Sequence, residues 1–204
     1  MQGDMNMRTI VALAGRCGSG KDAAADAAAR DLGFVNLKFA QPLKNAASVL
    51  FGLPPECFTD RELKDAPHSR LLGSTPRRVL QWLGTDVMQH GLVDAGIMPG
   101  VGRCFWAQRL ADTIDALPAE VDRVVISDMR FPHELELLKQ RFGGILSVRL
   151  ERPSATGASE HESESAVDGM DVDVVLRNEG TLEQFEGSFV RLVLERTNVS
   201  AHKG

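Results

Sequence analysis

The residues best suited to chemistry are 15–22, which read Gly-Arg-Cys-Gly-Ser-Gly-Lys-Asp. They follow an apolar, β-branched run at 9–13 and precede an alanine-rich stretch at 23–29, which is the order strand, tight turn, helix. Glycines let backbone N–H groups point inward, the helix N-terminus adds positive charge, and Lys21 supplies a mobile ammonium. An ordinary glycine-rich turn is the alternative. The pattern favours a loop that binds the phosphates of a nucleotide, with predicted contacts from Gly15, Cys17, Gly18, Ser19, Gly20, Lys21 and Asp22.

The loop ends in Asp22, at the position where such loops usually carry a Ser or Thr hydroxyl that contacts Mg²⁺. A carboxylate there can hold the ion or its waters, and it also adds negative charge beside a triphosphate. We therefore expect a metal site that includes Asp22, and nucleotide binding that depends strongly on Mg²⁺.

A second acidic group follows the short apolar run at 124–126, which is typical of a strand buried on both faces of a parallel sheet. Ligands of such sheets bind at the carboxyl ends of the strands, so Asp128 is predicted to orient Mg²⁺ or accept a proton there. Arg130 and Glu134 follow and crowd the same point. The competing interpretation is that Asp128 caps a helix beginning near Pro132.

The run at 75–86 is the next informative segment. Spacings of three and four place Gln81 and Thr85 on one side of a helix, and Arg77 or Arg78 falls on that side too. Arginine can bind a phosphate through two hydrogen bonds, and a glutamine amide can read the edge of a base. The run therefore predicts an acceptor site, with a solvated polar helix face as the alternative.

Several later side chains have two interpretations each. Trp106 can stack on a nucleobase or belong to the core. Arg149 and Arg152 flank the end of the strand expected at 145–150 and precede a polar flap, and they either act on a transferring phosphoryl group or remain surface charges. Asn178 and Gly180 contact an adenine edge or only make a turn.

The pattern of apolar residues predicts alternating strands and helices. The expected strands are 9–13, 34–40, 124–126, 145–150 and 172–176. The expected helices are 22–32, 42–51, 75–90, 105–117, 131–142 and one that begins after Thr181. We expect no core element at 52–74, which is interpreted as a mobile substrate-side segment, a loop at 91–102 and a solvated, lid-like flap at 151–170. This order predicts a single domain over 1–204 with a three-layer α/β fold of the P-loop NTPase type, whose central parallel sheet of about five strands is flanked by helices.

Bulk properties narrow the class of protein. The chain has 204 residues, 43% hydrophobic residues and a net charge of −5, which suits one globular domain and disfavours broad binding to nucleic acid. It contains no apolar stretch long enough to cross a bilayer and no signal-peptide pattern, so we expect a cytoplasmic protein without a membrane partner. Cys17, Cys57 and Cys104 lack the spacing of a zinc site and are interpreted as reduced thiols.

With these residues in place, the chain resembles the phage-type deoxynucleoside monophosphate kinases within the P-loop nucleoside monophosphate kinase group. The residues that carry the resemblance are the loop through Lys21-Asp22, the run 75–86, Phe105-Trp106, Asp128-Met129-Arg130-Phe131 with Glu134, the patch 161–164 and Asn178-Glu179-Gly180-Thr181.

The resemblance implies transfer of the γ-phosphoryl group of ATP to a deoxynucleoside monophosphate with Mg²⁺. The sequence does not decide between a monomer and a homodimer. By matching position, Ser19, Lys21 and Asp22 would serve ATP and metal. The monophosphate would be held by Arg77, Arg78, Gln81, Gly84, Thr85 and Trp106. Asp128, Arg130 and Glu134 would complete the active centre around the metal, the phosphate and the sugar. Ala23 departs from relatives that carry a threonine hydroxyl, which affects how metal or phosphate is oriented at the loop.

Two other functions compete with this one. A different small-molecule kinase on the same scaffold, such as a dephospho-CoA or phosphomevalonate kinase, would also use paired arginines, so only Gln81 and Trp106 favour a base. A non-catalytic nucleotide-dependent switch is the second alternative. The absence of an Asn-Lys-x-Asp run counts against a GTPase.

Overall fold

A computed structural model describes residues 8–153 and 166–197 of the chain. The described residues fall into two compact units. The sheet unit takes its residues from Met1–Lys38 and Leu110–Gly204, and the helical unit is Phe39–Arg109. Whether the chain forms a single domain stays a prediction.

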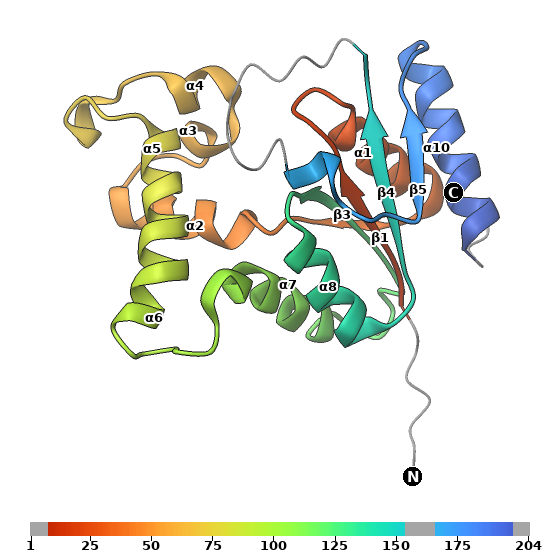
Figure 1. The fold of residues 1–204 in the computed structure, drawn as a ribbon. Coiled ribbons are helices and arrows are strands. Elements are labelled where there is room, and N and C mark those ends of the chain that lie inside the picture. The colour runs from red at the N-terminus through yellow and green to blue at the C-terminus, as the bar shows by residue number, and fades with distance from the viewer. Residues whose placement is uncertain (1–7, 154–165, 198–204) are drawn as a thin grey trace. The chain divides into compact units, whose positions relative to one another are not determined.

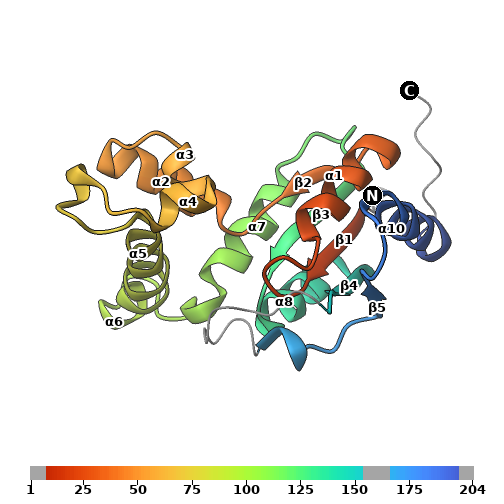
Figure 2. The ribbon, with the colours of Figure 1, turned by 90° about the horizontal axis from the view of Figure 1, so that it is seen from above.

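The sheet unit is built on five parallel strands in the order β2-β3-β1-β4-β5 (Figures 1 and 2). Their bounds are β1 Thr9–Ala14, β2 Val35–Leu37, β3 Arg123–Met129, β4 Ile145–Glu151 and β5 Val174–Arg177. Residues 124–126 are fully buried, because β3 lies between two strands and both sheet faces are covered. The predicted fold class is confirmed, and β3 runs past its expected end to include Asp128.

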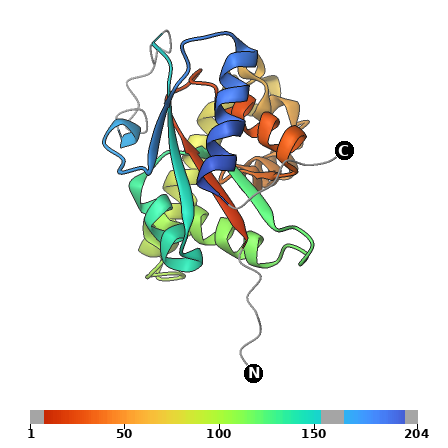
Figure 3. The same ribbon diagram turned by 90° about the vertical axis from the view of Figure 1, so that its right-hand side faces the viewer.

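Helices cover both faces of this sheet. On one face lie α1 (Lys21–Leu32) and α10 (Leu182–Arg196), and α8 (Pro132–Phe142) lies on the other (Figures 2 and 3). Buried alanines of α1 allow a close approach to the sheet, and Phe185 and Phe189 of α10 fill the same core cluster. The helix α7 (Phe105–Asp115) begins in the helical unit and ends in the sheet unit. No described helix has the length and apolar character needed to cross a bilayer.

The helical unit contains more structure than its sequence suggested. Its helices are α2 Gln41–Phe51, α3 Glu56–Thr59, α4 Arg61–Asp65, α5 Pro76–Gln81 and α6 Leu92–Asp94, with 3₁₀ turns at Ser69–Leu71 and Gly102–Cys104 and a π-helical segment at Trp82–Gly91. The expectation of no core element at 52–74 was wrong, because Cys57, Phe58 and Leu71 are buried in a core cluster with residues of α2 and α5. The loop expected at 91–102 was also wrong in part, since α6 lies within it.

Candidate active site

The predicted phosphate loop connects β1 to α1, and the side chain of Lys21 folds back to hydrogen-bond with the backbone of this loop. The Lys21 ammonium donates hydrogen bonds to the carbonyl oxygens of Gly15 at 2.5 Å and Arg16 at 2.9 Å. Gly18 and Gly20 have φ values of 79° and 106°, which L-residues other than glycine rarely adopt. The sequence thus places glycines where the backbone requires them, and Cys17 lies exposed in the same loop.

Asn178 holds this loop from the end of β5. Its side-chain amide is buried and donates a 3.0 Å hydrogen bond to the carbonyl oxygen of Ser19. We predicted contact with an adenine edge for Asn178, and that contact stays a prediction. The bond to Ser19 was missed because it joins residues 159 positions apart, which no local pattern reveals.

The Ser19 hydroxyl is the notable polar group of the loop. Ser19 is 1% exposed, and among the described residues its Oγ has no hydrogen-bond partner. A buried hydroxyl without a partner costs about 1–3 kcal/mol, so it is rarely kept without a ligand to bind. Because its Oγ lacks a partner among the described residues, Ser19 is a candidate ligand contact, and its role in ATP binding stays a prediction.

A cavity of about 440 Å³ opens beside the loop. Its lining comes from the loop, the ends of β4 and β5 and residues near 167, and its charged members are Arg16, Arg149, Glu151, Arg152, Asp168, Arg177 and Glu179. The loop and the ends of β4 and β5 therefore meet at one crevice. The lining does not include Asp128 or Arg130 from the end of β3.

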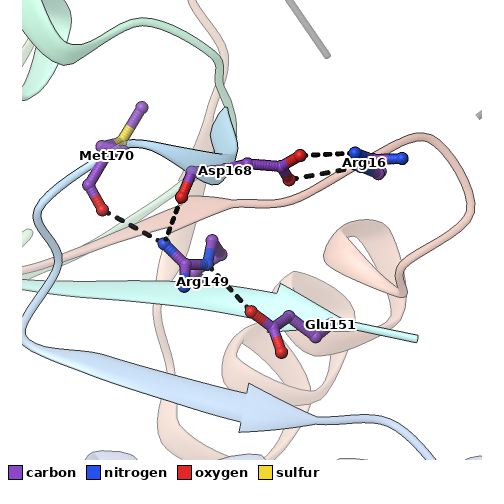
Figure 4. Close-up of polar contacts among 5 residues, drawn as sticks. All are labelled: Arg16, Arg149, Glu151, Asp168 and Met170. Atoms are coloured by element: carbon purple, nitrogen blue, oxygen red, sulfur yellow. Dashed lines mark hydrogen bonds and ion pairs between the residues drawn. The ribbon is translucent and has the colours of Figure 1, made fainter. Parts of the chain in front are cut away.

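Two arginines tie residues 168–170 to this cavity (Figure 4). Arg16 pairs with the Asp168 carboxylate, and the hydrogen bonds of this pair hold the pKa of Asp168 below its usual value. The Arg149 guanidinium donates to the carbonyl oxygens of Asp168 at 3.1 Å and Met170 at 3.2 Å, and to Glu151 at 3.1 Å. Arg149 is therefore already hydrogen-bonded within the protein and is not a free surface charge.

Residues 151–170 were expected to form a solvated flap, and residues 154–165, with the patch 161–164, lie outside the described residues. At the described end of that range Val167 and Met170 are only 2% and 3% exposed. The described part of the expected flap is therefore partly packed, because two apolar side chains are buried there.

The end of β3 carries the other predicted catalytic groups. Asp128 is the penultimate residue of β3, half-buried, and it does not cap α8, which begins at Pro132. Arg130 follows and is exposed. Glu134 is buried, and its Oε2 accepts hydrogen bonds from the backbone N–H groups of Arg130 at 2.7 Å and Phe131 at 3.0 Å. Glu134 therefore fixes the turn that presents Arg130, whether or not it also contacts a substrate.

Burial raises the pKa of Glu134 to about 7, against the opposing effect of its two backbone hydrogen bonds. The unfolded chain has the ordinary, lower pKa, so the folded state binds more protons between about pH 4 and 7, and the free energy of unfolding falls as pH rises through 7. Glu134→Gln cannot ionise. We expect its free energy of unfolding, relative to the unsubstituted protein, to increase by about 2–3 kcal/mol between pH 5 and pH 9.

Urea unfolding at a series of pH values checks this prediction. Glu136→Gln is the matched control, because Glu136 is exposed on the same helix, and it should follow the unsubstituted protein. A difference between Glu134→Gln and the unsubstituted protein that does not change with pH would show that the Glu134 carboxyl does not titrate as argued.

The predicted acceptor residues lie in the helical unit. Arg77 is bound to the Asp65 carboxylate, with one of its hydrogen bonds at 2.9 Å, and this pairing lowers the pKa of Asp65. Arg78 follows it, and its guanidinium makes no hydrogen bond or ion pair to a described residue. Gln81 and Thr85 are exposed, as a ligand-binding face requires.

Gly84 and Trp106 have packing roles in this unit. A Cβ on Gly84 would lie 2.8 Å from Leu43 Cδ2, so a larger residue here would require the Leu43 side chain to shift where the π-helical segment meets α2. The Trp106 indole N–H donates to the Gly84 carbonyl oxygen at 3.0 Å, and its ring meets Phe105 edge to face. These contacts match the core interpretation of Trp106, and its contact with a substrate stays a prediction.

Comparisons with known proteins identify the family of this chain. The model of the deoxynucleotide monophosphate kinase family matches residues 73–188. A protein of Acanthamoeba polyphaga mimivirus that bears this kinase name is 35% identical over 90% of this chain and 95% of its own. The deoxynucleotide monophosphate kinase of Enterobacteria phage T4 is 28% identical over 53% of this chain and 41% of its own. A solved sugar kinase from Janibacter sp. HTCC2649 aligns over 95% of this chain and 96% of its own, with 17% identity and a TM-score of 0.48.

The family match covers more than half of the chain, and the mimivirus relative extends it over nearly the whole length. The chain is therefore a member of the deoxynucleotide monophosphate kinase family.

Proposed function

We propose that this protein transfers the γ-phosphoryl group of ATP to the 5′-phosphate of a deoxynucleoside monophosphate, releasing ADP and a deoxynucleoside diphosphate. The observation that carries the ATP site is the phosphate loop, in which the buried Ser19 hydroxyl lacks a partner among the described residues. Family membership supplies the class of acceptor.

Binding of ATP requires Lys21 to exchange its two carbonyl partners for phosphate oxygens. Both of those partners belong to the loop itself, so the exchange breaks contacts within the loop. Gly15, Cys17, Gly18, Ser19 and Gly20 would contact the phosphates, while Arg149, Asn178 and Gly180 would contact the rest of the nucleotide. An oxygen of the acceptor phosphate attacks the γ-phosphorus as its bond to the ADP oxygen breaks, and Lys21 and Arg130 stabilise the charge of that transition state.

Mg²⁺ is the expected metal. Asp22 and Asp128 would hold it. Both belong to the sheet unit, Asp22 in the first turn of α1, which follows β1, and Asp128 near the end of β3, the strand that pairs with β1. Asp22 is 79% exposed and pairs with Lys38 at 2.8 Å, a contact that solvent and a cation can replace. The described residues contain no cluster of three or more metal ligands, which fits an ion held by one or two carboxylates together with substrate phosphates. When bound, Mg²⁺ neutralises charge on the β- and γ-phosphates.

The acceptor would bind through the exposed polar face of the helical unit. Arg78, Gln81 and Thr85 lie on that face, and the family resemblance also assigns Arg130 and Glu134 to the substrate. Of the two neighbouring arginines, Arg78 is the better phosphate ligand, because Arg77 is already bound to Asp65.

A coupled assay of ADP release across a panel of acceptors tests this proposal. We expect turnover with at least one of dTMP, dGMP and dCMP in the presence of Mg²⁺, and its loss in excess chelator. Turnover only with dephospho-CoA or phosphomevalonate would show that the protein is a different small-molecule kinase. ATP binding without turnover of any acceptor would favour a nucleotide-dependent switch.

A further inference from the structure

A second cavity lies in the helical unit, away from the phosphate loop in sequence. Its volume is about 240 Å³, and its lining residues are Phe51, Ser74, Arg78, Val79 and Trp82. They come from the end of α2, the residue before the cap of α5, α5 itself and the start of the π-helical segment. Small-molecule sites usually exceed 300 Å³, so this cavity suits one ring system rather than a whole nucleoside triphosphate.

Trp82 is the unusual residue of this cavity. Its side chain is 51% exposed, whereas Val79 and Leu83 beside it are 9% and 8% exposed. The helix therefore already buries its apolar face, and the indole is not needed to complete the core.

The charge beside Trp82 is suited to a phosphate. Arg78 precedes Trp82 by four residues, so the two side chains lie one turn apart on the same side of the helix, with Cβ atoms about 5–6 Å apart in such pairs. No described carboxylate neutralises Arg78, in contrast to Arg77. A half-exposed indole, a second aromatic ring from Phe51 and an unneutralised guanidinium together match a flat aromatic ring that carries an anionic group.

The other tryptophan is committed to the fold. Trp106 donates its indole N–H to the Gly84 carbonyl oxygen and packs edge to face on Phe105. Stacking a base on Trp106 would have to preserve both contacts. Trp82 needs no such rearrangement.

We propose that Trp82 stacks on the base of the acceptor nucleotide, with Phe51 as the floor of the pocket and Arg78 bound to the 5′-phosphate. This inference rests on the proposed function, in which the acceptor is a deoxynucleoside monophosphate. It assigns base contact to a residue that the sequence pattern and the family resemblance left out.

Kinetics of two Trp82 variants test the assignment. Trp82→Leu removes the aromatic face, and we expect it to raise KM for the accepted monophosphate by about 5- to 50-fold. KM for ATP should stay within about twofold, because ATP binds in the sheet unit. Trp82→Phe should recover most of the affinity, since a phenyl ring still stacks. Ile97→Ala is the matched control, because Ile97 is an exposed apolar residue of the same unit that does not line the cavity.

The arginine pair gives an independent comparison. Arg78→Met should raise KM for the monophosphate more than Arg77→Met, because only Arg78 lines the cavity. The reverse order would assign the phosphate contact to Arg77 and overturn this part of the proposal.

Fluorescence provides a readout that does not depend on turnover. The chain has two tryptophans, so quenching by the monophosphate in the absence of ATP comes from Trp82 or Trp106. We expect quenching in the unsubstituted protein and its loss in Trp82→Phe. Full quenching in Trp82→Phe, or an unchanged KM in Trp82→Leu, overturns the inference while leaving the kinase activity in place. An unsubstituted protein that turns over no monophosphate in the acceptor panel would instead overturn the proposed function.

Discussion

Lys21→Ala is expected to lower kcat/KM for phosphoryl transfer by about 10²–10³-fold or more. The lysine is the mobile cation of the phosphate loop, and loss of one preorganised charge or donor from a transition state costs about this much. The variant also removes two hydrogen bonds that close the loop over Gly15 and Arg16, so ATP affinity should fall as well. Steady-state kinetics with the best monophosphate and calorimetric titration of ATP measure the two effects separately.

Arg30→Ala is the matched control for Lys21. Arg30 lies in the last turn of the same helix and pairs with the surface carboxylates Asp31 and Glu186. The Arg30→Ala variant removes the same formal charge as Lys21→Ala, but at the far end of α1. Its kcat/KM should stay within about twofold of the value for the unsubstituted protein. Near-normal turnover in Lys21→Ala, with Arg30→Ala equally unaffected, would remove the loop lysine from the mechanism.

Gly20→Ala is expected to damage both the loop and the core beneath it. A Cβ at Gly20 would lie 2.7 Å from Asn178 Nδ2 and 2.9 Å from Phe185 Cε1, in a backbone conformation with φ of 106°. Strain and overpacking each cost about 1–3 kcal/mol, so we expect a loss of about 2–4 kcal/mol of stability. ATP affinity should fall too, because displacing Asn178 releases the Ser19 carbonyl oxygen. Thermal unfolding with and without ATP measures both losses.

Two other glycines separate the causes. Gly18→Ala has a left-handed φ of 79° but open space around the added methyl group, so it reports backbone strain alone. Gly187→Ala lies in α10 with no atom within 4 Å of the added Cβ, and it should be neutral or slightly stabilising. If Gly20→Ala destabilises the protein no more than Gly18→Ala, the packing of Asn178 and Phe185 against Gly20 contributes nothing.

The phosphate loop and the sheet were predictable because their determinants are local. A β-branched run, glycines at set positions and an alanine-rich helix occur within about 25 consecutive residues, and each pattern has a direct physical cause. The buried strand at 124–126 was equally clear, since an uninterrupted apolar run suits a strand covered on both faces. The core of 52–74 was hidden because its short helices lie between prolines and glycines, and Phe58 has no periodic apolar neighbours to mark it.

The sequence by itself determined that this protein has a glycine-rich loop between a strand and a helix of a parallel α/β sheet, and it predicted that this loop binds a nucleotide. Only the tertiary structure decided that the Asn178 amide donates to the Ser19 carbonyl oxygen and that Arg16 pairs with Asp168. It also decided that Asp65 forms an ion pair with Arg77 and not with Arg78. The first set follows from spacing between near neighbours in the chain. The second set depends on side chains that are far apart in the sequence and that only the packing of strands and helices brings within hydrogen-bond distance. The local pattern of apolar residues does not reveal such pairs.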